Sequence, residues 1–176
     1  PKKEPYALQI VTANGTTWGS LKNFIRKLPI EVGVVLIQEH HLLGHKLGDA
    51  STWAARNGWK GFFEPAIGTP KGSRGGVAIL ARNFLGLTRP TGACTTVWAG
   101  RAIAAVLQAP GCRPTLCVST YLETGVGMSE TNCKILAAVG QRVADDECKC
   151  FCVGGDFNVP PDALASFART VQGQLV

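Results

Sequence analysis

A short run in which every residue but the last is apolar, GVVLIQ at positions 33–38, most constrains the fold of this chain. A strand with no polar face has to be covered by other elements on both sides. Two more such runs stand at 7–13 and 150–153, and shorter ones at 60–64 and 77–81. Between them, four segments have apolar residues three and four positions apart or the composition of a helix: 18–28, 49–56, 129–143 and 160–170. This alternation predicts a layered α/β domain.

The remaining segments predict one hairpin and one long loop. Residues 102–108 and 115–121 read as strands, and Pro110-Gly111 between them is a turn signal. Residues 65–76 contain four Gly and two Pro, which predicts a loop. Because there are no internal repeats, low-complexity tracts or linkers, residues 1–176 read as a single domain.

Composition narrows the class of protein. Hydrophobic residues make up 45% of the chain and charged residues 17%, which argues against intrinsic disorder. No apolar run reaches the roughly 18 residues that a membrane-spanning helix needs, so no membrane partner is expected. A net charge of +6 favours an anionic partner such as nucleic acid.

The seven cysteines include no C-x-x-C pair. We expect them to be reduced and mostly buried, with Cys148, Cys150 and Cys152 on one face of a strand. Reduced thiols favour an intracellular, reducing compartment, either nucleus or cytoplasm.

Polar side chains follow several of the apolar runs, at the points where the strands end: Asn14, Glu39, Tyr121, Asp156 and Asn158. If the strands are neighbours, these groups meet at one edge. Carboxylate, amide and phenol oxygens suit Mg²⁺ and phosphate better than zinc. Each residue alone would also suit a turn or a strand end, so the argument depends on their joint occurrence.

Five motifs in order resemble those of the endonuclease/exonuclease/phosphatase superfamily. They are TANG at 12–15, LIQE at 36–39, GGVAIL at 75–80, STY at 119–121 and GGDFN at 154–158. The nearest resemblance is to the N-terminal part of apurinic-site repair and retroelement endonucleases. The resemblance implies a four-layer α-β-β-α sandwich that is C-terminally incomplete.

The resemblance also implies roles for the five residues. Glu39 would bind Mg²⁺ or Mn²⁺, and Asn14 would support the metal and phosphate. Asp156 would orient the attacking water, Asn158 would contact the scissile phosphate and keep Asp156 in place, and Tyr121 would contact the phosphate or the leaving group.

Further residues are candidates for substrate contact, and others depart from the family pattern. His40 beside Glu39, and Lys71 and Arg74 in the Gly/Pro segment, could meet a phosphate backbone. The family's further Asp pair and terminal His have no counterpart before Val176, and Thr16 stands where many repair nucleases have an acidic ligand. We therefore expect a domain truncated from a longer polypeptide, with weak or no activity alone.

The predicted function is a Mg²⁺-dependent phosphodiester hydrolase, a DNA endonuclease of the retroelement or repair type, using in-line attack by an activated water. The basic balance and the short loop at 121–125, in place of a longer lipid-binding insertion, favour the endonuclease reading, and DNA is expected rather than RNA. Two alternatives stay open: a phosphatase or phosphodiesterase acting on inositol phosphates, lipids or RNA, and a domain fragment without catalysis.

Overall fold

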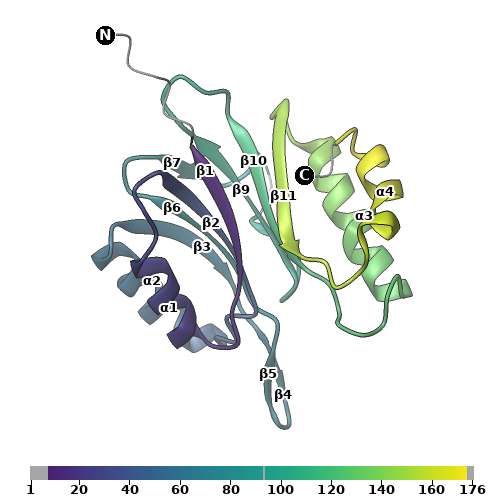
Figure 1. The fold of residues 1–176 in the computed structure, drawn as a ribbon, viewed down its shortest axis with the longest axis horizontal. Coiled ribbons are helices and arrows are strands. Elements are labelled where there is room, and N and C mark those ends of the chain that lie inside the picture. The colour runs from purple at the N-terminus through teal and green to yellow at the C-terminus, as the bar shows by residue number, and fades with distance from the viewer. Residues whose placement is uncertain (1–7, 93, 174–176) are drawn as a thin grey trace.

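Two β-sheets stacked face to face form the centre of the molecule (Figure 1). The computed structural model describes residues 8–92 and 94–173. The first sheet has the strand order β1-β2-β6-β3, and the second has the order β11-β10-β9-β7 with β8 paired to β9. The first sheet comprises β1 (Gln9–Asn14), β2 (Val32–Gln38), β3 (Trp59–Glu64) and β6 (Val77–Arg82). The second comprises β7 (Gly86–Thr88), β8 (Thr96–Trp98), β9 (Ala102–Gln108), β10 (Thr115–Tyr121) and β11 (Cys150–Asp156).

Helices cover the outer face of each sheet, so that the domain has four layers (Figure 1). The helices of the first flank are α1 (Trp18–Arg26) and α2 (Leu47–Arg56), the latter preceded by the short 3₁₀ turn η1 (Gly44–Lys46). Those of the second flank are α3 (Glu130–Asp145) and α4 (Pro161–Thr170). None of the helices formed by the described residues combines the length and apolar character that a bilayer span demands.

Local signals explain where the helices begin. Thr17 caps α1, since its side chain accepts a hydrogen bond from the backbone N–H of Ser20 at 3.1 Å. Ser129 caps α3 in the same way, accepting from Asn132 N at 3.3 Å. Pro161 occupies the first turn of α4, where its missing N–H costs no hydrogen bond.

Three hydrophobic clusters lie between the layers. The central cluster joins the two sheets, with Leu36 and Ile79 from the first sheet meeting Ile103 and Cys117 from the second. A second cluster packs α1 and α2 against the first sheet. A third packs α3 and α4 against the second sheet. Strand β2 lies between the first two clusters and is buried at all seven positions, which confirms the prediction from its continuous apolar run.

The segment 65–76, predicted as a loop, is partly a two-stranded ribbon. Strands β4 (Ile67–Thr69) and β5 (Gly72–Arg74) pair antiparallel and project beyond the sheets, at the bottom of Figure 1. Most of their residues are exposed. The ribbon has no apolar face, which is why its sequence has the character of a loop.

The cysteines are free thiols, as predicted, but their placement differs from the prediction. Cys94, Cys112 and Cys133 are exposed rather than buried. Cys152 packs on the cluster between the sheets, whereas Cys148 packs on the helical side. The three neighbouring cysteines do not share one face because Cys148 precedes the first residue of β11.

Candidate active site

The carboxyl ends of parallel strands from both sheets meet at one end of the sandwich. In the first sheet β1 runs parallel to β2, with Asn14 opposite Gln38. In the second sheet β10 runs parallel to β11, with Tyr121 opposite Asp156. The predicted residues follow or end these four strands, so the layering brings together side chains that are far apart in sequence.

One hydrogen bond joins the two halves of the site. The Nδ2 group of Asn14 donates to Oδ2 of Asp156 at 2.5 Å, across 142 positions of sequence. The other carboxylate oxygen, Oδ1, accepts from the backbone N–H of Asn158 at 3.3 Å. Both oxygens of Asp156 therefore accept hydrogen bonds from neighbours, which orient the carboxylate.

Asn158 fixes the loop on the other side of Asp156. It has a positive φ of 50°, a conformation that asparagine tolerates better than most residues. Its Nδ2 donates to the carbonyl of Leu122 at 2.9 Å, and Leu122 N donates to the Asp156 carbonyl at 3.0 Å. The side chain thus ties the GGDFN turn to the chain that follows Tyr121.

Glu39 and Tyr121 are neighbours. Glu39 is half-buried and has a φ of 54°, an unusual value for a non-glycine residue and one that clusters at functional sites. Burial raises the pKa of the Tyr121 hydroxyl, and the nearby Glu39 carboxylate raises it further. The Tyr121 hydroxyl also lies 3.3 Å from Oγ1 of Thr124. At neutral pH the hydroxyl therefore keeps its proton and can act as a hydrogen-bond donor.

A buried polar relay holds the two sheets in register beneath the site. Gln38 is fully buried; its Oε1 accepts from Thr12 Oγ1 and its Nε2 donates to Ser119 Oγ, both at 2.9 Å. Ser119 Oγ in turn donates to the Ile37 carbonyl at 2.8 Å. This relay links β1, β2 and β10 one residue before Glu39 and two before Tyr121.

His40 is not placed to contact a phosphate, which corrects the prediction for this residue. It is 1% exposed. Leu42 N donates to Nδ1 at 3.0 Å, so Nδ1 carries no proton and Nε2 donates to the Glu64 carbonyl at 3.1 Å. Both ring nitrogens are thus used within the protein. Burial lowers the pKa of His40 to about 4, so the ring is neutral at pH 7.

Lys71 and Arg74 are both exposed on the projecting ribbon, Lys71 at its turn and Arg74 as the last residue of β5. An Nη1 atom of Arg74 lies 3.6 Å from Oε1 of Glu123, with 59% of the arginine side chain exposed. An ion pair this exposed contributes little to stability, so Arg74 can exchange Glu123 for another anion at small cost.

Arg101 was not among the predicted site residues, yet it packs directly against Tyr121. Its guanidinium stands over the Tyr121 ring, 4.6 Å from the ring centre, and its Nη2 donates to Glu123 Oε1 at 3.2 Å. A charged residue at the start of the buried run 102–107 was the available signal, because such a residue needs a partner.

The two glycines that begin the GGVAIL motif pack closely against residues next to the site. Gly75 and Gly76 have φ values of 70° and 86°. A Cβ at Gly75 would lie 2.5 Å from the Gly100 carbonyl, and one at Gly76 would lie 2.6 Å from the ring of His40. Only glycine allows the backbone to pass this close to Gly100, which precedes Arg101, and to His40, which follows Glu39.

The donor set fits Mg²⁺, which commonly binds one or two protein carboxylates and completes its shell with water and substrate phosphate. Glu39 and the amide oxygen of Asn14 are the candidate ligands. Within residues 8–92 and 94–173, neither Glu39 nor Asp156 forms an ion pair with a basic side chain. In the same part of the chain, no three His, Cys, Asp or Glu side chains form a metal-binding group.

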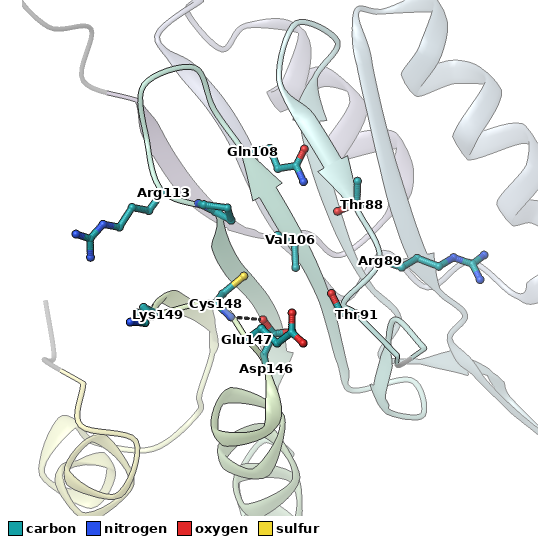
Figure 2. Close-up of a pocket in the computed structure, with 11 residues that line it drawn as sticks. Thr88, Arg89, Thr91, Val106, Gln108, Arg113, Asp146, Glu147, Cys148 and Lys149 are labelled. Carbon is teal, nitrogen blue, oxygen red and sulfur yellow. Dashed lines mark hydrogen bonds between the residues drawn. The ribbon is translucent and has the colours of Figure 1, made fainter.

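A surface groove of about 470 Å³ lies elsewhere. It is lined by the last residue of β9, Gln108, and by residues just before β10 and β11, so it lies at the opposite end of the second sheet (Figure 2). Basic Arg89 and Arg113 and acidic Asp146 and Glu147 border it. None of the predicted site residues lines this groove.

Comparison with solved structures finds similar folds among phosphoesterases. The structure of ANGEL2, a 2′,3′-cyclic phosphatase, matches with a TM-score of 0.56 and 16% identity, over 85% of this chain and 44% of its own. The AP endonuclease LMAP from Leishmania major matches with a TM-score of 0.56 and 15% identity, over 84% and 54%. The endonuclease domain of TRAS1, a telomere-specific non-LTR retrotransposon, matches with a TM-score of 0.58 and 16% identity, over 92% and 71%.

At these identities the likeness shows the fold, and the predicted four-layer sandwich is confirmed at that level. The chain spans about half the length of the first two of these structures. No protein-family model matches the sequence. No curated protein matches it either.

Proposed function

We propose, from the premise that this chain has the fold of the endonuclease/exonuclease/phosphatase enzymes, that it forms the active-site region of a Mg²⁺-dependent phosphodiester hydrolase acting on DNA. The observation that supports the proposal best is the hydrogen bond from Asn14 to Asp156, with Glu39 and Tyr121 beside it. It places two carboxylates, an amide and a protonated phenol where two sheets meet.

In the proposed reaction Asp156 accepts a proton from the attacking water. Asn14 and the backbone N–H of Asn158 orient its two oxygens, so the carboxylate is aligned before substrate arrives. Tyr121, which keeps its proton, donates a hydrogen bond to the phosphate or to the leaving oxygen. Glu39 and Asn14 would hold Mg²⁺, which when bound neutralises negative charge on the phosphate.

Three observations favour nucleic acid, and DNA in particular, as the substrate. The chain has a net charge of +6, and its projecting ribbon presents Lys71 and Arg74 to solvent. Basic groups of this kind contact phosphates without reading sequence. Two of the structurally similar proteins are named as an AP endonuclease and a retrotransposon endonuclease domain.

A second candidate function is hydrolysis of a cyclic or terminal phosphate on RNA. The similar fold of ANGEL2, described as a 2′,3′-cyclic phosphatase, favours it. The same residues would serve, since both reactions need a positioned water and an electrostatically stabilised phosphate. A domain without catalysis remains the third reading and is an outcome of the test below.

The deciding experiment compares nicking of supercoiled plasmid by the full-length product with and without Mg²⁺. Asp156→Ala and Glu39→Gln are expected to lose activity by a factor on the order of 100 or more, because each removes a group that acts in the transition state. Asp162→Asn, in the exposed first turn of α4, is the matched control and should retain activity. Equal nicking by all four proteins would refute the site.

A parallel assay separates the substrates. A 2′,3′-cyclic mononucleotide and an RNA with a cyclic phosphate end are incubated under the same conditions. Turnover of these with no plasmid nicking would favour the second candidate. If the protein neither nicks plasmid nor turns over the cyclic phosphates, and also fails to bind Mn²⁺, a domain without catalysis would be favoured.

A further inference from the structure

Arg101 is a buried charge next to the candidate site. Only 5% of the residue is exposed. It directly precedes β9, and its carbonyl accepts a hydrogen bond from the backbone N–H of Tyr121 at 2.8 Å. Its guanidinium stacks on the Tyr121 ring, and Nη2 reaches Glu123 at 3.2 Å. The same side chain therefore contacts both the ring of Tyr121 and the loop that follows it.

Folding stability does not account for a charge at this position. Burial of a guanidinium is expensive unless its donors are satisfied. Here Nη1 is buried and has no hydrogen-bond partner within residues 8–92 and 94–173. A buried ion pair is weak evidence of a stabilising role, because packed apolar groups in place of both partners are often neutral for stability.

Separate elements fix the two ends of the Arg101 side chain. The Gly100 N–H donates to Glu64 Oε1 at 3.2 Å, which anchors the turn that leads into Arg101. At the other end, Asn132 from α3 holds the backbone of Glu123: its Oδ1 accepts from Glu123 N at 2.8 Å and its Nδ2 donates to the Glu123 carbonyl at 3.1 Å. These contacts hold the Arg101 guanidinium against one face of the Tyr121 ring.

We infer that Arg101 is a positioning residue, which fixes the ring of Tyr121 so that its hydroxyl stays beside Glu39. The inference rests on the proposed function, in which that hydroxyl contacts the phosphate. A desolvated cation over an aromatic face attracts the ring electrostatically, which favours one ring orientation over others. Glu123 supports the arrangement by accepting the Arg101 hydrogen bond.

The first test observes Tyr121 directly and needs no activity. The chain has two tyrosines, so Tyr6→Phe leaves Tyr121 as the single site for 3-fluorotyrosine. In this background the ¹⁹F resonance is expected to shift and broaden in Arg101→Met, and to shift less in Arg101→Lys, which keeps the charge but not the planar stacking group. Arg74→Met, which removes the other partner of Glu123, is the control and should leave the resonance in place. An unchanged resonance in Arg101→Met would overturn the inference.

The second test asks whether Arg101 acts through Tyr121. Tyr121→Phe is expected to lower kcat by a factor on the order of 100 with little change in KM. Arg101→Met should lower kcat in the same sense, and Arg101→Lys should restore part of the loss. The double variant should be no slower than Tyr121→Phe alone, since the hydroxyl to be positioned is then gone. Additive losses would overturn the inference. If the native protein shows no hydrolysis, the proposed function fails and the ¹⁹F experiment alone decides the role of Arg101.

Discussion

Replacement of Gly76 by alanine should destabilise the protein by an amount that can be worked out from its surroundings. Gly76 has a φ of 86°, and a left-handed conformation costs an ordinary residue about 1–2 kcal/mol. The new methyl group would also lie 2.6 Å from Cε1 and 2.8 Å from Nδ1 of His40. Contacts this short force the ring to move.

The ring of His40 has little freedom to move, since hydrogen bonds to Leu42 and Glu64 fix both of its nitrogens. Loss of the two bonds would cost about 1 kcal/mol each. Together with the backbone strain, Gly76→Ala should lower the free energy of unfolding by about 3–4 kcal/mol.

The assay is urea unfolding at pH 7.5, with Gly58→Ala as the matched control. Gly58 has a φ of 82° but no heavy atom within 4 Å of the position of a Cβ, so its replacement tests backbone strain alone. Gly76→Ala should therefore cost about 2 kcal/mol more than Gly58→Ala. This difference in cost between the two glycine variants should shrink in a His40→Ala background, because the imidazole ring is then absent. Equal costs for the two glycine variants, or the same excess without the ring, would refute the reasoning.

Three further predictions concern pH, the buried relay and the projecting ribbon. Burial holds the pKa of His40 at about 4 against 6.5 when unfolded, so the unfolded chain binds the proton more readily between these values. The free energy of unfolding should be highest above pH 6.5 and fall by about 3 kcal/mol towards pH 4, as measured by urea unfolding with EDTA present. An equal fall in His40→Gln would contradict this cause. Gln38→Leu should lower the free energy of unfolding by about 2 kcal/mol, because it leaves the fully buried Ser119 hydroxyl without its Gln38 partner; a neutral effect by thermal denaturation would show that the relay is dispensable. Lys71→Gln with Arg74→Gln should weaken DNA binding in fluorescence anisotropy and reduce the slope of log K against log salt by nearly 2, whereas an unchanged slope would exclude phosphate contact.

The sequence predicted the layers because local patterns determine them. Strand β2 is buried on both faces, so its apolar run has no interruption, and α3 shows helical spacing because one stripe faces the second sheet. Strands β7 and β8 were not predicted. Each has three residues and depends on pairing with β9, which no local pattern records.

The site was predicted in part for the same reason. The parallel-strand rule places Asn14 and Asp156 at the carboxyl ends of their own strands. Because these strands belong to different sheets, it was the family resemblance, with its two stacked sheets, that brought the two residues together. The burial of His40 could not be predicted, because its ring occupies the space that a side chain at position 76 would fill. Gly76 lies 36 positions further along the chain, so no local pattern records the contact. Arg101 was missed because its partners, Tyr121 and Glu123, belong to a different strand and loop.

The sandwich is assembled from two contiguous stretches of chain, and this determines when the candidate site can first be complete during folding. The first sheet uses residues between 9 and 82, and the second uses residues between 86 and 156. Each stretch can pair its own strands, yet neither contains both members of the Asn14–Asp156 couple. Formation of this hydrogen bond would then report the docking of one sheet on the other during refolding. By the same logic, two separately produced fragments divided near residue 84 would bring Asn14 and Asp156 together only on association.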